Sequence, residues 1–367
     1  MTSTKIYEDI AKRSKGEICL GVVGPVRSGK STLIQRFMET LVLPNLADEN
    51  EAARARDEMP QSAGGKTVMT TEPKFVPKEA AKVVLQGGVH CRIRLCDCVG
   101  FLIPGALGEE EDGQTRMVHT PWQSEPIPFA KAAYIGTEKV IKEHATVGIL
   151  VTSDGSIGEF SREEYREAEQ LTVNELKKTG KPFIIVCNSA DTESEAALQQ
   201  AMQMEQDYGI PVALVNCQKL DAEDIRHILE LLLFEFPIRA VAIKMPTWLG
   251  ALPPADELGQ KIRQEVYTCA CAAHKLSELG NAFCKFRENA PIASVRVDEI
   301  DAASGQARME LQLRPGLFYE TIAQKSSLPI ENDADLMRTV CELAKTRAAY
   351  ERLRVALDEV EEKGYGI

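Results

Sequence analysis

The segment GPVRSGKS, residues 24–31, constrains the fold more than any other part of the sequence. It follows the apolar run Ile18–Val23 and precedes the helix-like stretch Ser31–Thr40, which predicts a buried strand before it and a helix after it. In the pattern G-x-x-x-x-G-K-[ST], backbone N–H groups surround a phosphate and the helix N-terminus adds a positive partial charge. A glycine-rich turn without a ligand is the alternative, and the strand–loop–helix context argues against it.

The fixed positions of this loop have separate roles in phosphate binding. Gly24 and Gly29 allow the backbone to turn with its N–H groups facing inwards. Lys30 reaches the β- and γ-phosphates as a point charge, and the hydroxyl of Ser31 can bind Mg²⁺. The predicted nucleotide-binding set also includes their neighbours Arg27, Ser28 and Thr32.

Charge and composition limit the class of partner. The chain of 367 residues has a net charge of −12 and no cluster of Lys or Arg, which argues against nucleic acid as a partner. It shows neither a signal peptide nor an apolar run of about 18 residues, so we expect a cytoplasmic protein. The ten cysteines are scattered without a C-x-x-C pair, which favours reduced, buried thiols over metal binding or disulfides.

Residues 19–237 alternate short β-rich runs with helical stretches, a pattern typical of a parallel sheet covered by helices. The predicted strands are Ile18–Val23, Ala81–Leu85, Val89–Cys96, Val147–Thr152, Phe183–Cys187 and Val212–Val215. The predicted helices are Ser31–Thr40, Ile127–Glu143, Arg162–Lys178, Glu193–Tyr208 and Ala222–Phe234. This order resembles the nucleotide-binding fold of regulatory GTPases, in which two neighbouring strands run antiparallel.

We expect residues 1–237 to form the nucleotide-binding domain and residues 238–367 to form a smaller α+β domain. The predicted elements of the second domain are the strands Val241–Lys244, Ala293–Val297 and Arg308–Leu313 and the long helices Asp256–Arg287 and Asp333–Glu362. The last of these helices has an apolar stripe that includes Leu336, Leu343 and Leu357. Such a stripe either forms a coiled seam or packs on its own domain, and the second arrangement is the commoner one.

Two later motifs indicate what happens to the bound nucleotide. In CRIRLCDCVG, Asp97 ends a buried strand and Gly100 follows three residues later, as in the D-x-x-G element of switch-type nucleotide hydrolases. Asp97 would hold Mg²⁺ and the Gly100 N–H would approach the γ-phosphate. Thr70 and Thr71 lie between the two motifs, where a hydroxyl, that of Thr71 in our prediction, completes the Mg²⁺ shell and senses the γ-phosphate. A polar loop without a sensor is the alternative.

Phe101 follows Gly100 at the position where many GTPases have a glutamine that orients the attacking water. An apolar side chain cannot hydrogen-bond water, so we expect slow hydrolysis unless another group supplies the missing stabilisation. Arg27, inside the phosphate loop, is our candidate for a catalytic positive charge. An ion pair with the acidic residues of 48–58 is the alternative role for this arginine.

Base specificity is expected from VCNSAD, residues 186–191. This stretch keeps the Asn188 and Asp191 of the N-K-x-D guanine-recognition motif and lacks its lysine. Asp191 can accept hydrogen bonds from N1–H and the amino group of guanine, whereas adenine presents an acceptor there. The residues alone therefore favour guanine slightly.

Four segments together resemble the stage IV sporulation protein A family of endospore-forming bacteria. They are LGVVGPVRSGKSTLIQRFME, ARDEMPQSAGGKTVMTTEPKFVP, DCVGFLIPGA and TPWQSEPIPFAKAAYIGT. The likeness covers the whole chain and is weaker after about residue 240.

The resemblance implies a nucleotide-binding domain related to translation-factor GTPases that uses ATP. Lys30 would bind the triphosphate and Asp97 would organise Mg²⁺ and hydrolysis. The sensors would be Thr70 and Thr71. The residues alone leave the choice between ATP and GTP open, and the extent of the resemblance together with the missing lysine leads us to expect ATP.

The resemblance also implies a role and partners. Hydrolysis would drive irreversible self-assembly into the basement layer of the spore coat, in the mother-cell cytoplasm at the forespore surface, with other coat proteins as partners. In the family, a further C-terminal region anchors the polymer to a small amphipathic membrane peptide, and this region has no counterpart after Ile367.

Two other functions are alternatives. A switch-type GTPase in signalling or ribosome function fits the loop motifs, but the acidic charge and the missing lysine argue against it. A small-molecule kinase needs an acceptor lid with several arginines, whereas residues 101–123 are acidic and rich in Gly and Pro.

Overall fold

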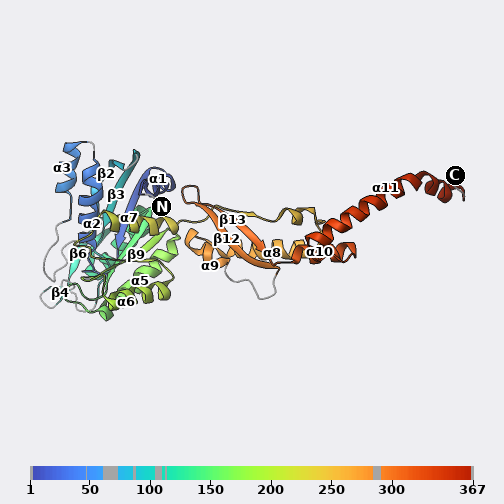
Figure 1. The fold of residues 1–367 in the computed structure, drawn as a ribbon. Helices are drawn as coiled ribbons and strands as arrows, with labels where there is room; N and C mark the ends of the chain where they lie inside the picture. The colour runs from blue at the N-terminus through green and yellow to red at the C-terminus, as the bar shows by residue number, and fades with distance from the viewer. Residues whose placement is uncertain are drawn as a thin grey trace. The chain divides into compact units, whose positions relative to one another are not determined.

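A six-stranded sheet organises the first part of the chain in the computed structural model (Figure 1). The structure describes residues 3–46, 48–60, 73–85, 88–103, 110–111, 114–283 and 291–364. The six strands are β1 (Glu17–Val23), β2 (Lys74–Leu85), β3 (Val89–Asp97), β8 (Val147–Ser153), β9 (Phe183–Asn188) and β10 (Val212–Val215). Their order is β10-β9-β8-β1-β3-β2, in which β2 is antiparallel to β3 and the other neighbours are parallel.

Helices surround this sheet, and the central strands are buried on both faces, as parallel strands usually are. The helices are α1 (Ser3–Arg13), α2 (Lys30–Phe37), α3 (Glu49–Asp57), α4 (Phe129–Lys139), α5 (Arg162–Thr179), α6 (Glu195–Tyr208) and α7 (Ala222–Phe234). On one face, Val23 of β1 and Leu150 of β8 pack with Val140, which follows α4, and with Val173 of α5. Helix α1 packs against α7.

All six predicted strands and all five predicted helices of this part are present. The largest differences lie at the starts of elements. Strand β2 begins at Lys74, and α4 begins only at Phe129 because the preceding residues form a hairpin. The short strands are β4 (Glu110–Glu111), β5 (Gln114–Thr115), β6 (Met117–Thr120) and β7 (Gln123–Pro128). Proline at the end of β7 fits a strand edge and a helix start, because it lacks the N–H that a helix interior needs.

A three-stranded sheet with the order β11-β13-β12 organises the second part. Its elements are β11 (Ala240–Lys244), α8 (Glu257–Ala272), α9 (Leu279–Ala282), β12 (Ile292–Asp301), β13 (Gln306–Leu313), α10 (Leu317–Ser326) and α11 (Asp333–Lys363). Ile262 and Val266 of α8 pack on Ile292 of β12 and Leu311 of β13. Side chains along β13 alternate between buried and exposed, as expected for a sheet with one covered face.

The chain divides into two compact units whose boundary is not a single point in the sequence. The first unit consists of Met1–Ala240, His274–Glu278 and Ile300–Ala307, and the second of Val241–Ala273, Leu279–Glu299 and Arg308–Ile367. Within the first unit, Arg13 of α1 donates to the carbonyl of Pro237 at 3.0 Å and its guanidinium lies against Gly305. The turn between β12 and β13 is therefore a packed part of the first unit.

The predicted single helix Asp256–Arg287 is wrong, because α8 ends at Ala272 and Ala273 is extended. Residues 274–278 instead belong to the first unit and bond to other residues of it: the N–H of Ile238 donates to the carbonyl of His274 at 2.9 Å. The buried carboxylate of Glu235 accepts from Lys275 at 2.6 Å and from Ser277 at 2.7 Å. These non-local bonds override the local helical pattern.

The apolar stripe of the last helix does not pack on its own domain, contrary to the commoner arrangement. Leu336 is half-buried, but most of the stripe is exposed: Met337 is 66% exposed, Leu353 is 59% exposed, and Val340, Leu343, Tyr350, Leu357 and Val360 are exposed to a similar degree. Among the described residues, none of the helices combines the length and the apolarity needed to cross a bilayer.

Replacing two of the glycines by alanine is expected to change the stability of the protein in opposite directions. Gly250 has an ordinary φ, and an added Cβ would meet no atom within 4 Å. Gly305 has φ +74°, and its Cβ would lie 2.5 Å from the guanidinium of Arg13. We expect Gly250→Ala to raise the free energy of unfolding of its unit by about 0.4–1 kcal/mol and Gly305→Ala to lower that of its unit by about 1–3 kcal/mol. Thermal midpoints measure both shifts, and a decrease in both variants would contradict the comparison.

Candidate active site

The loop 24–31 joins β1 to α2, and its glycines are required by close contacts. Gly24 has φ +137°, and a Cβ there would lie 2.2 Å from the carbonyl oxygen of Val151. Gly29 precedes α2 with φ +102°, and its Cβ would lie 2.3 Å from the side-chain nitrogen of Asn188. Only glycine combines these dihedral angles with these approaches. The loop therefore has the tight, inward-turned backbone that phosphate binding needs.

Lys30 places its positive charge inside this loop. Its side chain is 5% exposed, and its ammonium donates to the carbonyl of Pro25 at 2.6 Å. Burial lowers the pKa of Lys30, Cys98 and Asp97 oppose this shift, and the charge of Arg27 adds to it. A buried ammonium that donates to a neutral carbonyl gains strongly from a charge-assisted hydrogen bond to an anion that can reach it.

Ser31 and Asp97 form the pair that would hold a metal ion. The Ser31 hydroxyl donates to Asp97 Oδ2 at 2.8 Å, while Asp97 Oδ1 is buried and has no hydrogen-bond partner. Burial raises the pKa of Asp97, which the charge of Lys30 and the Ser31 hydrogen bond oppose. Hydroxyl and carboxylate oxygens are the donors that Mg²⁺ prefers, and a divalent cation favours the ionised carboxylate. These residues fit Mg²⁺.

The loop after Asp97 lies directly on the phosphate loop. A Cβ on Gly100 would lie 2.0 Å from the carbonyl oxygen of Gly24 and 2.7 Å from the ammonium of Lys30. Gly100 has φ +92°, a second reason for glycine at this position. The D-x-x-G motif and the phosphate loop, far apart in the sequence, are therefore parts of one site.

The remaining predicted loop residues occupy different positions. Arg27 is a non-glycine residue with φ +63°, and its carbonyl accepts from the hydroxyl of Tyr165 at 3.3 Å. The hydroxyl of Ser28 is buried without a hydrogen-bond partner, and Thr32 lies half-buried in the first turn of α2. Thr70 and Thr71 lie outside the described residues, so their predicted sensor and metal roles stay predictions.

The side chain of Asn188, at the end of β9, connects the phosphate loop to the segment after β10, and we call its two hydrogen bonds the Asn188 tie. Asn188 is 2% exposed; its amide donates to the carbonyl of Ser28 at 3.1 Å and accepts from the N–H of Cys217 at 2.9 Å. Asp191 is exposed and its Oδ1 accepts from the N–H of Glu193 at 3.1 Å. The predicted roles of Asn188 and Asp191 in base recognition stay predictions.

Sequence reasoning missed two contributors to this site, Cys217 and Tyr165. Cys217 follows β10, which ends beside β9, and the carboxyl ends of parallel strands meet at one edge of a sheet. This rule identifies the segment after each predicted strand as a candidate. Tyr165 belongs to α5, whose apolar pattern gives no sign of a contact with the loop 24–31.

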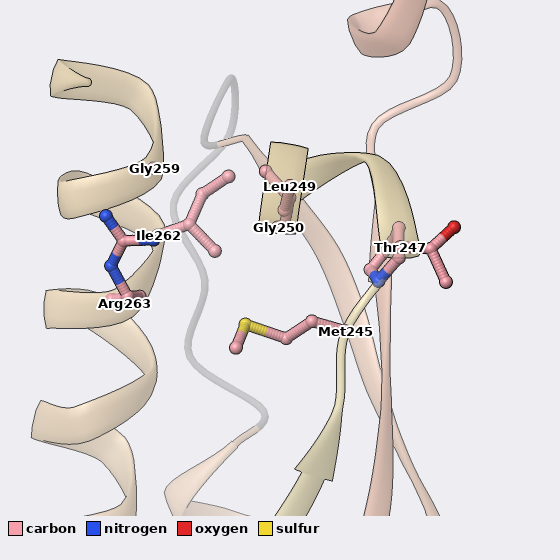
Figure 2. Close-up of a pocket in the computed structure, with 8 residues that line it drawn as sticks. Met245, Thr247, Leu249, Gly250, Gly259, Ile262 and Arg263 are labelled. Atoms are coloured by element: carbon pink, nitrogen blue, oxygen red, sulfur yellow. The ribbon is translucent and has the colours of Figure 1, made fainter. Parts of the chain in front are cut away.

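A hollow of about 320 Å³ in the second unit has a different chemistry (Figure 2). It lies between the turn Thr247–Ala251 and α8, and the side chains of Met245 and Ile262 point into it. The guanidinium of Arg263 lies beside Gly259 and donates to the carbonyl of Pro254 at 3.3 Å. This mostly apolar lining does not match a phosphate site, so the loop 24–31 is the better candidate for the nucleotide.

Comparison with known proteins places this geometry in a family. Residues 1–237 match the family profile described as "Stage IV sporulation protein A, ATPase domain", and residues 238–367 match "Stage IV sporulation protein A, middle domain". The chain belongs to the stage IV sporulation protein A family. The resemblance inferred from the four sequence segments is thereby confirmed.

Similar relatives span the whole chain. It is 39% identical over 365 residues to stage IV sporulation protein A of Clostridioides difficile. This alignment covers 100% of this chain and 74% of the relative. It is 40% identical over 370 residues to that of Bacillus subtilis, with 100% and 75% covered. A member of this family with its ATPase domain is a sporulation protein with ATPase activity.

Asn188→Ala tests the tie described above. It leaves the carbonyl of Ser28 and the N–H of Cys217 buried without a partner, which costs about 1–3 kcal/mol. Because the tie acts on the phosphate loop, we expect ATP and GTP to lose affinity by the same factor, about fivefold or more. Competition against a fluorescent nucleotide measures both affinities.

Asp191→Ala is the control for this experiment, because its carboxylate is exposed and takes no part in the two hydrogen bonds of Asn188. If Asp191 recognises the base, Asp191→Ala changes the ratio of ATP affinity to GTP affinity, whereas Asn188→Ala leaves this ratio unchanged. Unchanged affinity for both nucleotides in Asn188→Ala would contradict the role of the tie.

Proposed function

We propose that this chain binds ATP with Mg²⁺ at the loop 24–31, hydrolyses it slowly, and uses the hydrolysis to drive its own assembly into the basement layer of the spore coat. The observation that supports this best is the meeting of Lys30, Ser31 and Asp97 where β1 and β3 end. We assign the domain to the translation-factor GTPase-like class of phosphate-loop folds, supported by the strand order β2-β3-β1-β8-β9-β10.

The residues of the site have separate proposed roles in hydrolysis. Lys30 and the inward N–H groups of the loop bind the β- and γ-phosphates. Ser31 and Asp97 would hold Mg²⁺, which neutralises phosphate charge when it is bound. Gly100, whose backbone lies against Gly24, directs its N–H towards the γ-phosphate. Water attacks that phosphate without a glutamine to orient it, because Phe101 stands at that position.

ATP is the proposed nucleotide on two grounds. The family profile that matches residues 1–237 is that of an ATPase domain. Ser189 stands where the guanine-recognition motif has a lysine, and its hydroxyl is bonded to the main chain of Asp191 at 3.0 and 3.2 Å. A switch-type GTPase is the second candidate, favoured by the retained Asn188 and Asp191 and by the strand order.

The proposed setting follows the family. The relatives are named for stage IV of sporulation, and we place this chain in the mother-cell cytoplasm at the forespore surface. Its proposed partners are other copies of itself and other spore coat proteins, with no nucleic acid. Contact with a small membrane-anchoring peptide would require a region other than residues 1–367.

The function is tested by measuring phosphate release and sedimentable polymer together, with Mg²⁺ and either ATP or GTP. We expect release and polymer with ATP, and loss of both in Lys30→Ala and Asp97→Ala, since each removes a charge from the site. Lys82→Ala, on an exposed face of β2, is the matched control and should behave as the unmodified chain. Preference for GTP without polymer would instead support the switch-type GTPase.

Arg27 gives a separate prediction about the catalytic charge. If its guanidinium stabilises the transferred phosphate, Arg27→Ala and Arg27→Gly should both reduce kcat at least about tenfold. Glycine tolerates φ +63° whereas alanine is strained there by about 1–2 kcal/mol, so the two variants separate charge from backbone. Single-turnover hydrolysis measures the rate. Full activity in Arg27→Gly alone would assign the effect to the backbone.

A further inference from the structure

The segment that follows Asp97 is fastened to the phosphate loop through its main chain. The N–H of Val26 donates to the carbonyl of Phe101 at 3.0 Å, and Pro25 and Phe101 form a parallel β-bridge. Because Phe101 directly follows Gly100, this bridge determines how far the Gly100 N–H and the Asp97 carboxylate lie from the loop. A displacement at Phe101 is therefore passed to both groups.

The side chain of Phe101 reinforces this attachment. It is 4% exposed, so it points into the protein and not towards solvent. Its apolar cluster consists of Val26, Phe101, Ile103, Phe160, Tyr165 and Ala168. The ring also meets that of Tyr134 edge-to-face, with centroids 5.3 Å apart. Burying such a ring contributes about 1.5–3 kcal/mol, which a polar side chain at this position loses.

Tyr165 contacts both the phosphate loop and the segment after Asp97. It is fully buried, its ring belongs to the same cluster as Phe101, and its hydroxyl donates to the carbonyl of Arg27 at 3.3 Å. Arg27 has a left-handed backbone, which a non-glycine residue keeps only where its surroundings hold it. One side chain thus supports the turn of the phosphate loop and the segment after Asp97.

We propose that Phe101 and Tyr165 form an aromatic clasp that fixes the segment after Asp97 against the phosphate loop, and that Phe101 is a positioning residue for hydrolysis. This inference rests on the proposed ATP hydrolysis. Phe101 occupies the position of a water-orienting residue but acts through Gly100 and Asp97, which it holds at the γ-phosphate side of the loop.

Two explanations of Phe101, the clasp and the loss of a water-orienting side chain, predict opposite effects of Phe101→Gln on the rate of hydrolysis. If Phe101 affected hydrolysis only by standing where a glutamine would orient water, Phe101→Gln would accelerate hydrolysis. If Phe101 holds the segment in place, the same change inserts an amide into an apolar cluster and releases the segment. Phe101→Leu keeps an apolar side chain in the cluster and should preserve the attachment.

The experiment compares kcat, KM for ATP and the thermal midpoint of these two variants with the unmodified chain. We expect Phe101→Gln to lower kcat at least about tenfold with KM changed by less than about threefold, and Phe101→Leu to restore kcat to within about threefold. A kcat in Phe101→Gln equal to or above that of the unmodified chain overturns the clasp, as does an equal loss in Phe101→Leu.

Tyr165→Phe tests the second half of the clasp in a variant that keeps its ring. It removes only the bond to the Arg27 carbonyl, and we expect kcat to fall about three- to tenfold. Tyr208→Phe is the matched control, because it removes a tyrosine hydroxyl bond of 2.7 Å to the buried Glu169, a bond in which no residue of the loop 24–31 takes part. Equal kcat values in both tyrosine variants would contradict the clasp. An unmodified chain that hydrolyses no ATP would instead reject the proposed function.

Discussion

Two opposite charges at one edge of the sheet, the buried ammonium of Lys30 and the half-buried carboxylate of Asp97, are the constraint on which the site depends. Removing ions from water costs several kcal/mol each unless other groups compensate. The parallel pairing of β1 with β3 sets Val22 opposite Asp97 and so brings both groups to the same edge. The surrounding glycines, the Ser31 hydroxyl and the Asn188 tie are arranged about this pair.

Sequence reasoning located the parts of this site that depend on local pattern. The phosphate loop and the D-x-x-G motif each follow a strand whose apolar run is visible in the sequence, so both were placed correctly on the sheet. Contacts between distant segments were beyond its reach. The tie of Asn188 to Cys217 and the contact of Tyr165 with Arg27 depend on the folded register. The helix predicted over 256–287 is wrong for the same reason, since residues 274–278 bond to other residues of the first unit and interrupt it.

Phe101 indicates one thing in the sequence and another in the folded structure. In the sequence it marks the absence of a polar group beside the reacting phosphate. In the fold its buried side chain joins the segment after β3 to the phosphate loop and to α5. Under the proposed function, this residue exchanges hydrogen bonding to water for a fixed position of the segment after Asp97.

The division of the chain into units has a consequence for how the protein can be cut. The polypeptide passes from one unit to the other after residues 240, 273, 278, 299 and 307, so neither unit is a continuous stretch of sequence. A fragment that stops at Pro237 keeps Glu235 but loses Lys275 and Ser277, which neutralise and hydrogen-bond its buried carboxylate. It also uncovers the face of Arg13 that lies on Gly305. The family boundary at 237/238 therefore does not coincide with the boundaries of the two compact units.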